Sequence, residues 1–337
     1  MTAMPPTTGH FQLIQFASLL APAVYVILCT QPHEPYSAER AEALRSAIAH
    51  HELNNVELIH YNKVIEQDPS SPGFHEMWKG LMKKFGISKN DLIVASEPYG
   101  KWLADITGAH FFPYDIHREV NPAKATAIRE DPLKYFTKIL PEFQANVVRT
   151  ITVFGAESTG KTTLSKQLAE ELGGTWLFEY ARPYLENTKN EITRKSMKAI
   201  WRGQAALQRH GQDFFNKPFI IQDTDLFSTV GYWQFPHWQK TLGECPKALI
   251  AEAKKMKSDL YIITRSNIPF EKDPLRYGGS KREGSDEYWI NVCKAYNLPY
   301  VILGSNDRAE RLNEAVYLAK KAFNNKARQL AFDRGGL

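Results

Sequence analysis

The sequence is poor in cysteine and has no dense run of one charge. Only three cysteines occur in 337 residues, Cys29, Cys245 and Cys293, and they form neither a CxxC motif nor a disulfide pattern. This argues against a disulfide-stapled secreted protein, and we expect a reducing, cytoplasmic location. Lysine and arginine are scattered, so the charge pattern indicates no nucleic-acid partner.

Long hydrophobic runs are also missing, although one segment imitates them. Residues 11–29 are mostly apolar, but Gln12 and Gln15 interrupt them, Pro22 divides them, and no lysine or arginine precedes them. A signal peptide carries positive charge before its apolar region. We therefore interpret the segment as a buried helix followed by a buried strand, rather than as a membrane segment, and expect no membrane partner.

The composition that remains is that of a globular protein, with 43% hydrophobic and 23% charged residues. The length predicts two domains of ordinary size. The net charge of +5 is unevenly divided, because residues 1–146 carry −3 and residues 147–337 carry +8. A modestly basic half suits a protein that binds phosphates. We place the boundary in the polar connector 141–148, which gives domains 1–145 and 146–337.

The second half is organised around a glycine-rich stretch, residues 155–162, which reads G-x-x-x-x-G-K-T and follows the apolar run 151–154. This is the P-loop spacing in its strand-to-helix context. Backbone N–H groups of such a loop face a phosphate chain, Lys161 reaches the β- and γ-phosphates, and the Thr162 hydroxyl holds Mg²⁺. The predicted ATP-binding residues of the loop are Gly155, Glu157, Ser158, Thr159, Gly160, Lys161, Thr162 and Thr163.

Two acidic residues follow a strand-like run at 219–222. Asp223 and Asp225 stand where a Mg²⁺ partner, or the base for an attacking hydroxyl, is expected beside a P-loop. An aspartate at this place is equally suited to cap the helix that follows. We expect both residues to act in catalysis, with Asp223 also at the metal, and the sequence does not decide which is the base.

A charged segment with two glycines, residues 269–282, follows the apolar run 259–264. Its cations and glycine hinge are typical of a lid that closes over a triphosphate. Arg276 would then meet the charge that develops on the transferred group, and Arg282 would bind phosphate. An exposed charged loop is the alternative.

Short apolar runs alternate with helical patterns along both halves. Such alternation predicts an α/β fold with parallel sheets and helices on both faces. Ligands of these sheets bind beyond the carboxyl ends of the strands. In the first half the expected strands are 24–28, 56–60, 92–95 and 109–112, and the expected helices 10–20, 37–50, 73–85 and 102–107. In the second half the expected strands are 151–154, 175–178, 219–222, 259–264 and 299–304.

Two places in the first half could bind phosphate. Residues 5–10 end in Gly9 and His10 at the start of a helix, where backbone and imidazole can both approach an anion. A capped helix start with an incidental histidine explains the same residues. Near the end of this half, Thr126 and Arg129 could face one phosphate from another helix start, although a surface helix start is the simpler interpretation.

Taken together, these motifs resemble the NadR-like bifunctional nicotinamide-nucleotide adenylyltransferase/ribosylnicotinamide kinase family. The resemblance covers nearly the whole chain, with both halves in the same order. The matching segments are residues 155–162, 179–184, 223–225 and 273–276 in the second half, and 5–10, 96–99 and 126–132 in the first.

The resemblance implies two consecutive steps of pyridine-nucleotide salvage. A P-loop kinase domain would phosphorylate nicotinamide riboside with ATP and Mg²⁺, with Glu179, Arg182 and Tyr184 placing the riboside. A Rossmann-like nucleotidylyltransferase domain would then join nicotinamide mononucleotide to the AMP part of a second ATP, forming NAD. In that domain the implied ATP-binding residues are Thr7, Gly9, His10, Thr126 and Arg129, with His10 catalytic.

The sequence departs from the family pattern in three places. Thr7 stands where the family usually has the first histidine of H-x-G-H, and Lys124-Ala125 replace Ser-Gly. Only residues 1–4 precede Pro5, so we expect the first strand of this domain to be absent. A kinase-only enzyme, or a protein that senses NAD and ATP, is therefore the alternative. The sequence does not determine the oligomeric state, and it allows a homo-oligomer.

Overall fold

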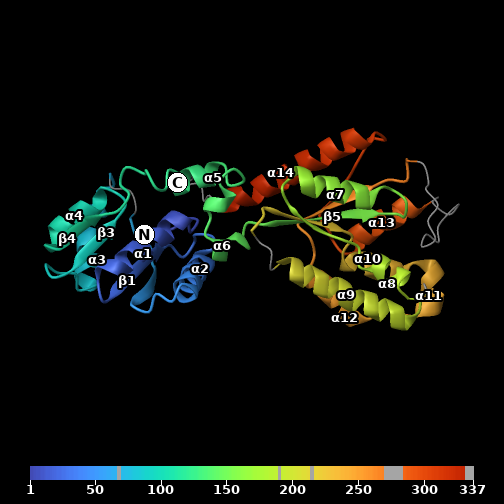
Figure 1. Cartoon of the computed structure of the whole chain (residues 1–337), viewed down its shortest axis with the longest axis horizontal. Helices are drawn as coiled ribbons and strands as arrows, with labels where there is room; N and C mark the ends of the chain where they lie inside the picture. Colours follow the sequence, from blue (N-terminus) through green and yellow to red (C-terminus); the bar gives the residue numbers. More distant parts are fainter. Residues whose placement is uncertain (67–69, 189–190, 213–215, 269–283, 331–337) are drawn as a thin grey trace. The chain divides into compact units, whose positions relative to one another are not determined.

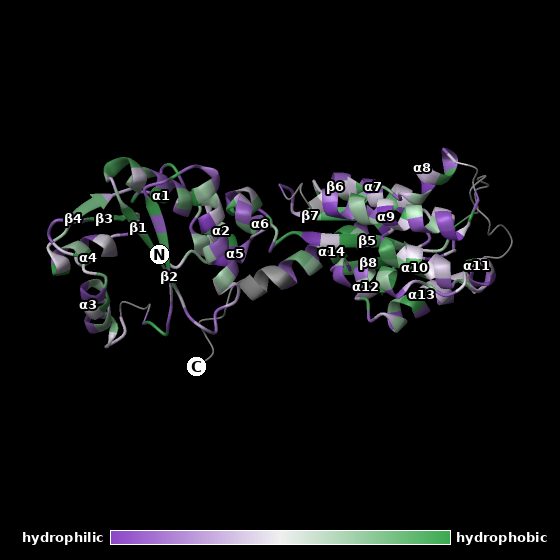
Figure 2. Cartoon of the chain, turned by 90° about the horizontal axis from the view of Figure 1, so that it is seen from below, coloured by the Kyte–Doolittle hydropathy of each residue, from purple (hydrophilic) through white to green (hydrophobic). Residues whose placement is uncertain are grey.

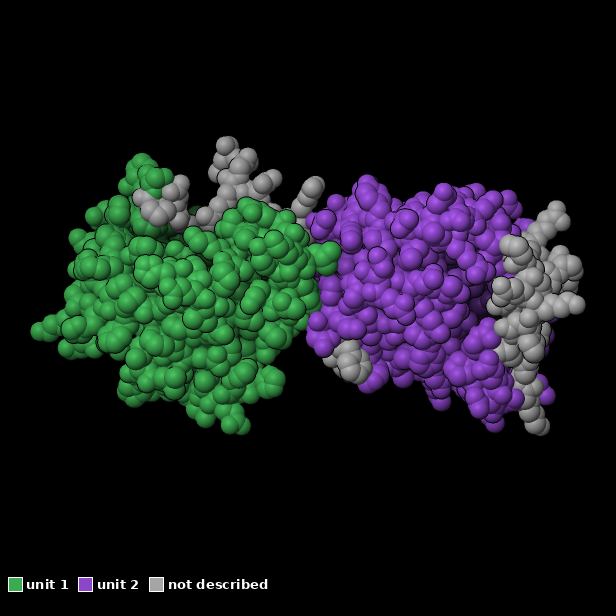
Figure 3. Space-filling view, turned by 45° about the horizontal axis from the view of Figure 1, so that its top comes forward, with its two compact units in different colours: residues 1–146, 326–337 green, residues 147–325 purple. Residues whose placement is uncertain are grey.

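The computed structural model describes residues 1–66, 70–188, 191–212, 216–268 and 284–330. The chain divides into two compact units, one of residues 1–146 with 326–337 and one of residues 147–325 (Figure 3). The division after Asn146 falls inside the connector 141–148. Unlike the predicted domain 146–337, the second unit ends at Asn325, within the last helix.

The second unit is built on a five-stranded parallel sheet with the order β6-β7-β5-β8-β9. Strands of a parallel sheet that is covered on both faces are mostly apolar, and the residues of β7 and β8 are all buried. This confirms the predicted α/β fold with a parallel sheet for this half. The strands are β5 (Arg149–Gly155), β6 (Thr175–Leu177), β7 (Phe219–Asp223), β8 (Leu260–Thr264) and β9 (Tyr300–Ile302).

Helices cover both faces of this sheet, with α7 and α14 on one side and α9, α10 and α12 on the other (Figure 1). The core on the second side includes Phe154, Trp233, Tyr261 and Trp289. Hydrophobic residues are concentrated on β5 and β8, while the surrounding helices carry polar residues (Figure 2). The helices are α7 (Lys161–Glu171), α8 (Ala181–Glu186), α9 (Arg194–Gln212), α10 (Leu226–Gln234), α11 (Pro236–Leu242), α12 (Lys247–Lys255), α13 (Ser285–Ala295) and α14 (Arg308–Leu330).

The first unit also alternates helices and strands, but its strands form two separate parallel pairs. β1 (Val24–Thr30) pairs with β2 (Val56–Asn62), and β3 (Leu92–Ala95) pairs with β4 (His110–Pro113). The helical elements are α1 (Thr8–Leu20), α2 (Ser37–His50), α3 (Phe74–Lys84), α4 (Tyr99–Thr107), α5 (Ala125–Glu130), the 3₁₀ helix η1 (Phe136–Lys138) and α6 (Pro141–Gln144).

The single parallel sheet expected for this half is therefore corrected to two pairs. The free side of β1 bonds to the start of the chain, because the Met1 ammonium donates to the Ile27 carbonyl and the Cys29 N–H donates to the Met1 carbonyl, each at 2.8 Å. These groups would otherwise be available to a neighbouring strand. Residues 11–29 form a helix and a strand, as predicted, and none of the described helices is long and apolar enough to cross a membrane.

We expect Gly155→Ala to destabilise the second unit strongly. A Cβ here would lie 2.6 Å from the Thr264 carbonyl oxygen, and the φ of 135° strains any residue with a side chain. The free energy of unfolding should fall by about 2–5 kcal/mol, measured by urea denaturation of the full chain. Gly173→Ala is the control, because its φ is 59° and no atom lies within 4 Å. It should cost about 1 kcal/mol. Equal losses in the two variants would contradict the contact with β8.

Candidate functional site

The loop between β5 and α7 has the closed form of a phosphate-binding P-loop. Gly155, Ser158 and Gly160 have positive φ values of 135°, 58° and 84°, and α7 begins directly at Lys161. The Thr159 hydroxyl donates to the Ala156 carbonyl at 2.9 Å and lies 2.6 Å from the Thr264 hydroxyl on β8. The loop is therefore held from within and from the neighbouring strand, and the N-terminus of α7 opens into it.

The Lys161 side chain folds back onto the P-loop. Its ammonium donates to the Ala156 carbonyl at 2.7 Å, five residues earlier in the chain. A bound phosphate would offer this flexible, strongly hydrated cation a charged acceptor in place of the neutral carbonyl. The structure thus places Lys161 where the sequence motif predicts it.

A cavity of about 280 Å³ opens in front of the P-loop. The predicted residues that line this cavity are 157–163 of the loop, Glu179, which precedes α8, and Arg182, which lies in α8. Gly155, Tyr184, Asp223 and Asp225 are not among the lining residues. Tyr184 instead stacks on Tyr180, with ring centroids 6.4 Å apart. The cavity thus joins the phosphate loop to the segment in which the sequence places the riboside.

Asp223 ends β7 immediately behind this cavity. It is 1% exposed, and its Oδ1 has no hydrogen-bond partner in the described structure. Burial raises the pKa of this carboxyl, while a hydrogen bond from Thr162 and the charges of Lys161 and Arg182 act in the opposite direction. An orphaned buried carboxylate oxygen of this kind calls for a cation or a proton.

Glu179 precedes α8 and shares the same charge cluster. Burial, and then the negative charge of Asp223, raise the pKa of its carboxyl to about 7, and Lys161 and Arg182 limit the rise. A carboxyl with a pKa near neutrality can both accept and release a proton at the pH of the cell. Of Glu179 and Asp223, Glu179 is the one that lines the cavity.

Asp225 has the capping role that the sequence left open. Its Oδ1 accepts from the Phe227 N–H at 2.9 Å, which caps α10, and its Oδ2 accepts from the Tyr261 hydroxyl at 2.6 Å. Burial raises the pKa of this carboxyl to about 6. Thr224, between the two aspartates, has a left-handed φ of 66° and turns them to different surroundings. The expectation that both aspartates face the reaction is corrected: Asp225 faces the core.

The residues present suit a magnesium ion that is shared with a nucleotide. Among the described residues no three histidine, cysteine or acidic side chains are grouped as a metal cage. Mg²⁺ is usually bound by one or two carboxylates together with substrate phosphates. The unpartnered Oδ1 of Asp223 and the neighbouring Thr162 hydroxyl are oxygen ligands of the required type.

Several lining residues were missed by sequence reasoning. Gln204 accepts from the Tyr180 N–H at 3.0 Å, and the Tyr232 hydroxyl lies 3.5 Å from Glu157. The apolar and aromatic wall consists of Leu185, Ile192, Met197, Ile200, Tyr232 and Trp238, and Arg308 and Arg311 of α14 complete the lining. Met197 and Ile200 of α9 are apolar residues at helical spacing, which is a signal that the sequence could have offered, whereas the other lining residues carry no local signal. Arg276 and Arg282 of the predicted lid lie outside the described residues.

In the first unit, Thr7 and His10 form a capping box at the start of α1. Thr7 Oγ1 accepts from the His10 N–H, and His10 Nδ1 accepts from the Thr7 N–H, each at 3.1 Å. Burial, with the nearby Met1 ammonium and Arg118, lowers the pKa of the imidazole to about 4. The ring is therefore neutral at physiological pH, and the bond to Nδ1 leaves the proton on Nε2. Thr7 itself is buried and engaged in the cap.

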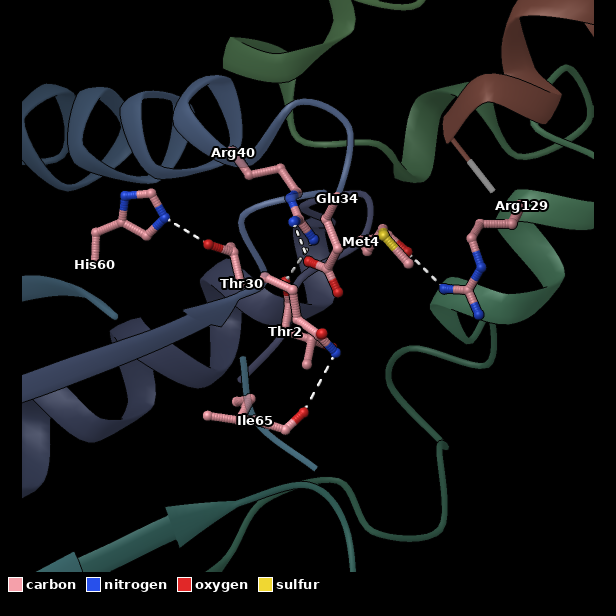
Figure 4. Close-up of polar contacts among 9 residues, drawn as sticks. Thr2, Met4, Thr30, Glu34, Arg40, His60, Ile65 and Arg129 are labelled. Carbon is pink, nitrogen blue, oxygen red and sulfur yellow. Dashed lines mark hydrogen bonds and ion pairs between the residues drawn. The ribbon is translucent and has the colours of Figure 1, made fainter. Parts of the chain in front are cut away.

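Arg129 lies beside the same helix start. Its guanidinium donates to the Met4 carbonyl at 2.6 Å (Figure 4). It also donates to the Thr126 hydroxyl at 3.1 Å. The structure therefore brings Arg129 of the predicted segment 126–132 to Met4, which directly precedes residues 5–10, although more than one hundred residues separate the two segments. Gly9, whose Cβ would lie 3.4 Å from the Asn121 side chain, completes this group.

A buried ion pair supports the loop after β1 in this unit. Arg40 pairs with Glu34 at 2.5 Å and donates to the Thr2 carbonyl at 3.2 Å, and Thr30 bonds to His60 at 2.7 Å (Figure 4). Arg40 and Glu34 are 1% and 7% exposed. Sequence reasoning gave no sign of this cluster, because its members lie on separate elements.

Comparisons with known proteins cover both units. Residues 150–311 match the family model of an AAA domain. The trifunctional NAD biosynthesis/regulator protein NadR of Escherichia coli (strain K12) is 25% identical over 340 residues, with 94% of this chain and 80% of that protein covered. The protein of the same name from Salmonella typhimurium (strain LT2) is 24% identical with the same coverage.

Solved structures agree with this at the level of the fold. A crystal structure of NadR protein in complex with NR superposes with a TM-score of 0.68 at 21% identity. Another, in complex with NAD and AMP-PNP, superposes with a TM-score of 0.64 at 21% identity. Each covers 96% of this chain and 94% of the other.

The raised pKa of Glu179 predicts a pH-dependent gain of stability in Glu179→Gln. In the folded protein the carboxyl holds its proton up to about pH 7, against a usual pKa of 4.5. The bound proton lets the carboxyl stay neutral in its buried place. The full free energy of unfolding is therefore retained below pH 4.5, and part of it is lost as the pH rises through 7 and the carboxyl ionises in the folded protein. Glu179→Gln escapes this loss, so at pH 8 its free energy of unfolding should exceed that of the wild type by at most about 3 kcal/mol. Near pH 4.5 the gain should vanish.

Urea denaturation of the ligand-free protein at the two pH values measures this difference. Glu171→Gln, at an exposed position at the end of α7, is the matched control and should show no pH-dependent gain. A Glu179→Gln protein that is less stable than the wild type at pH 8 would show that the carboxylate is well compensated in the fold.

Proposed function

The chain is a NadR-like protein, and we propose that its second unit transfers the γ-phosphoryl group of ATP to nicotinamide riboside, giving nicotinamide mononucleotide. The observation that carries this proposal is a cavity that is lined jointly by the P-loop, by Glu179 and Arg182, and by an apolar and aromatic wall. One end suits a triphosphate, and the wall suits a flat heteroaromatic ring. The complex of a NadR protein with NR supports the same substrate.

The P-loop supplies electrostatic stabilisation rather than covalent chemistry. Its N–H groups, the N-terminus of α7 and the Lys161 ammonium surround the phosphates and offset the charge that collects on the transferred group. Mg²⁺, held by Thr162 and Asp223, would neutralise phosphate charge when bound. In this proposal Asp223 serves the metal and the phosphates rather than the proton.

Glu179 is the group best placed to take the proton of the attacking hydroxyl. The riboside 5′-oxygen forms the new bond to the γ-phosphorus, the bond from that phosphorus to the β,γ-bridging oxygen breaks, and ADP leaves. The hydroxyl proton passes to the Glu179 carboxylate, whose pKa of about 7 matches this task. The sequence assigned Glu179 only to riboside binding, so this role refines that assignment. Arg182, which lines the same cavity, would orient the riboside hydroxyls or phosphate.

For the first unit we propose the adenylyltransferase step, in a Rossmann-like nucleotidylyltransferase domain. A phosphate oxygen of nicotinamide mononucleotide would attack the α-phosphorus of ATP, and pyrophosphate would leave. The neutral His10, donating through Nε2, with Gly9 and the nearby Thr126 and Arg129, would stabilise the phosphates. The complex of a NadR protein with NAD and AMP-PNP supports this proposal. A kinase-only enzyme or a NAD- and ATP-sensing protein is the alternative that the next experiment separates.

Two single variants should remove the two activities separately. Lys161→Ala removes the cation fixed at the P-loop, so riboside phosphorylation should fall at least ~10²-fold while adenylylation of supplied mononucleotide persists. His10→Ala should have the reverse effect, with adenylylation reduced roughly 10²–10³-fold, the scale of losing one preorganised donor. ADP release with riboside, and NAD formation from mononucleotide, measure the two steps. Wild-type protein that forms no NAD would leave the kinase assignment alone standing.

The neighbouring aspartates should differ sharply in their effect on phosphorylation. Asp223→Asn should lower the kcat for riboside at least ~10²-fold, because the side chain can no longer offer a charged oxygen to Mg²⁺. Asp225→Asn retains an acceptor for the Phe227 N–H, and its kcat should stay within a few-fold of the wild type. Steady-state kinetics of both variants at saturating Mg²⁺·ATP test this. Comparable losses would contradict the assignment of Asp225 to capping.

A further inference from the structure

Arg311 is a buried cation that joins three loops of the second unit. It lies in the first turn of α14 and is 4% exposed. Its guanidinium donates to the carbonyls of Ser305 at 2.7 Å, Thr159 at 3.1 Å and Arg265 at 3.4 Å, and to the side-chain oxygen of Asn267. One side chain therefore contacts the P-loop, the loop after β8 and the loop after β9.

The contact with Thr159 fixes the orientation of a P-loop peptide. A trans peptide unit is planar, and its C=O and N–H point in opposite directions. When Arg311 holds the Thr159 carbonyl, it also holds the Gly160 N–H on the other side of the same plane. Gly160 has a φ of 84° and stands immediately before α7, where the N–H groups of a P-loop converge on a phosphate.

The side chain of Thr159 is fixed independently. It is fully buried, and its hydroxyl bonds to the Ala156 carbonyl and lies 2.6 Å from the Thr264 hydroxyl. Thr159 is thus held through its side chain by β8 and through its carbonyl by α14. Without the hydrogen bond from Arg311 to the Thr159 carbonyl, the Thr159–Gly160 peptide would keep more freedom to rotate.

The electrostatic setting of Arg311 is unfavourable for a purely structural contact. A cation in the first turn of a helix opposes the helix dipole, and its four named acceptors are neutral oxygens. Burial, together with the charge of Arg308, lowers the pKa of the guanidinium, although the charge of Asp286 acts in the opposite direction. Arg311 also lines the cavity in front of the P-loop, so its positive charge becomes favourable once a nucleotide brings negative charge into that cavity.

We propose that Arg311 is a positioning residue that preorganises the Thr159–Gly160 peptide for the β-phosphate of the bound nucleotide. This inference rests on the proposed binding of ATP in the P-loop, and it adds a determinant that lies outside the sequence motif. Arg311 takes no part in proton transfer. Its effect is on the affinity for nucleotides that carry a β-phosphate, not on the affinity for the riboside.

The test compares Arg311→Met and Arg311→Lys in the full chain with the wild type. Titration calorimetry with Mg²⁺·ADP measures the affinity for the β-phosphate, and a parallel titration with nicotinamide riboside measures the other end of the cavity. Arg311→Met should weaken ADP binding on the order of 10- to 100-fold, with riboside affinity unchanged within about threefold. Arg311→Lys keeps one cationic donor but cannot reach three carbonyls, so its loss should be intermediate.

The control is Lys320→Met, at an exposed position of the same helix, which should bind ADP as the wild type does. A merely structural role would lower the thermal midpoint and the fraction of active protein, and would leave the ADP affinity of the folded fraction unchanged. That outcome would overturn the inference, as would equal losses of ADP and riboside affinity. If Arg311→Met does not fold, Arg311→Lys carries the same comparison.

Wild-type protein that binds ADP but does not phosphorylate riboside would refute the proposed substrate and leave this test intact. If the wild-type protein phosphorylates riboside, steady-state kinetics of that reaction give a second measurement. The KM for ATP should then rise with the dissociation constant for ADP, while the KM for riboside stays constant.

Discussion

The close approach of β5 to β8 at Gly155 is the constraint on which the second unit depends. A Cβ at this position would lie 2.6 Å from the Thr264 carbonyl, so the P-loop leaves the sheet in direct contact with the neighbouring strand. The Thr264 hydroxyl then supports Thr159 inside the loop. On the other side of β5, β7 delivers Asp223 to the same edge. A central strand between two parallel neighbours thus places loop, carboxylate and support together.

The charges gathered at this edge are mutually dependent. Burial holds the pKa of both Asp223 and Glu179 above its usual value, and the charge of Asp223 raises the pKa of Glu179 further. Lys161 and Arg182 offset part of that cost. Without a ligand, the negative charge of this cluster is not fully compensated, because Asp223 Oδ1 has no hydrogen-bond partner in the described structure. In the proposed function, a bound magnesium nucleotide would supply the missing positive and negative charges together, and the site would then be more complementary to its ligand than to solvent.

Local patterns predicted more of this protein than long-range contacts could reveal. The P-loop, the five strands of the second unit and the helix start at residues 5–10 follow from spacing and apolar runs, and all of them form. The separate roles of Asp223 and Asp225 do not follow, because a left-handed Thr224 turns one toward the P-loop and the other toward Tyr261. Strand order, the division of the first unit into two pairs, and Arg311 depend on partners distant in sequence. No local pattern encodes them.

Thr7 stands where the family that the sequence resembles usually has a histidine, and its contacts give this residue a physical role at the start of α1. The Thr7 hydroxyl caps α1 by accepting from the His10 N–H, and the Thr7 N–H donates to His10 Nδ1. This second bond selects the tautomer with its proton on Nε2, and the pKa of about 4 keeps the ring neutral. A second ionisable ring would bring another titratable group to this buried helix start. Thr7 therefore holds the His10 ring in one orientation and one tautomer. The proposed role of His10 as a neutral hydrogen-bond donor requires both.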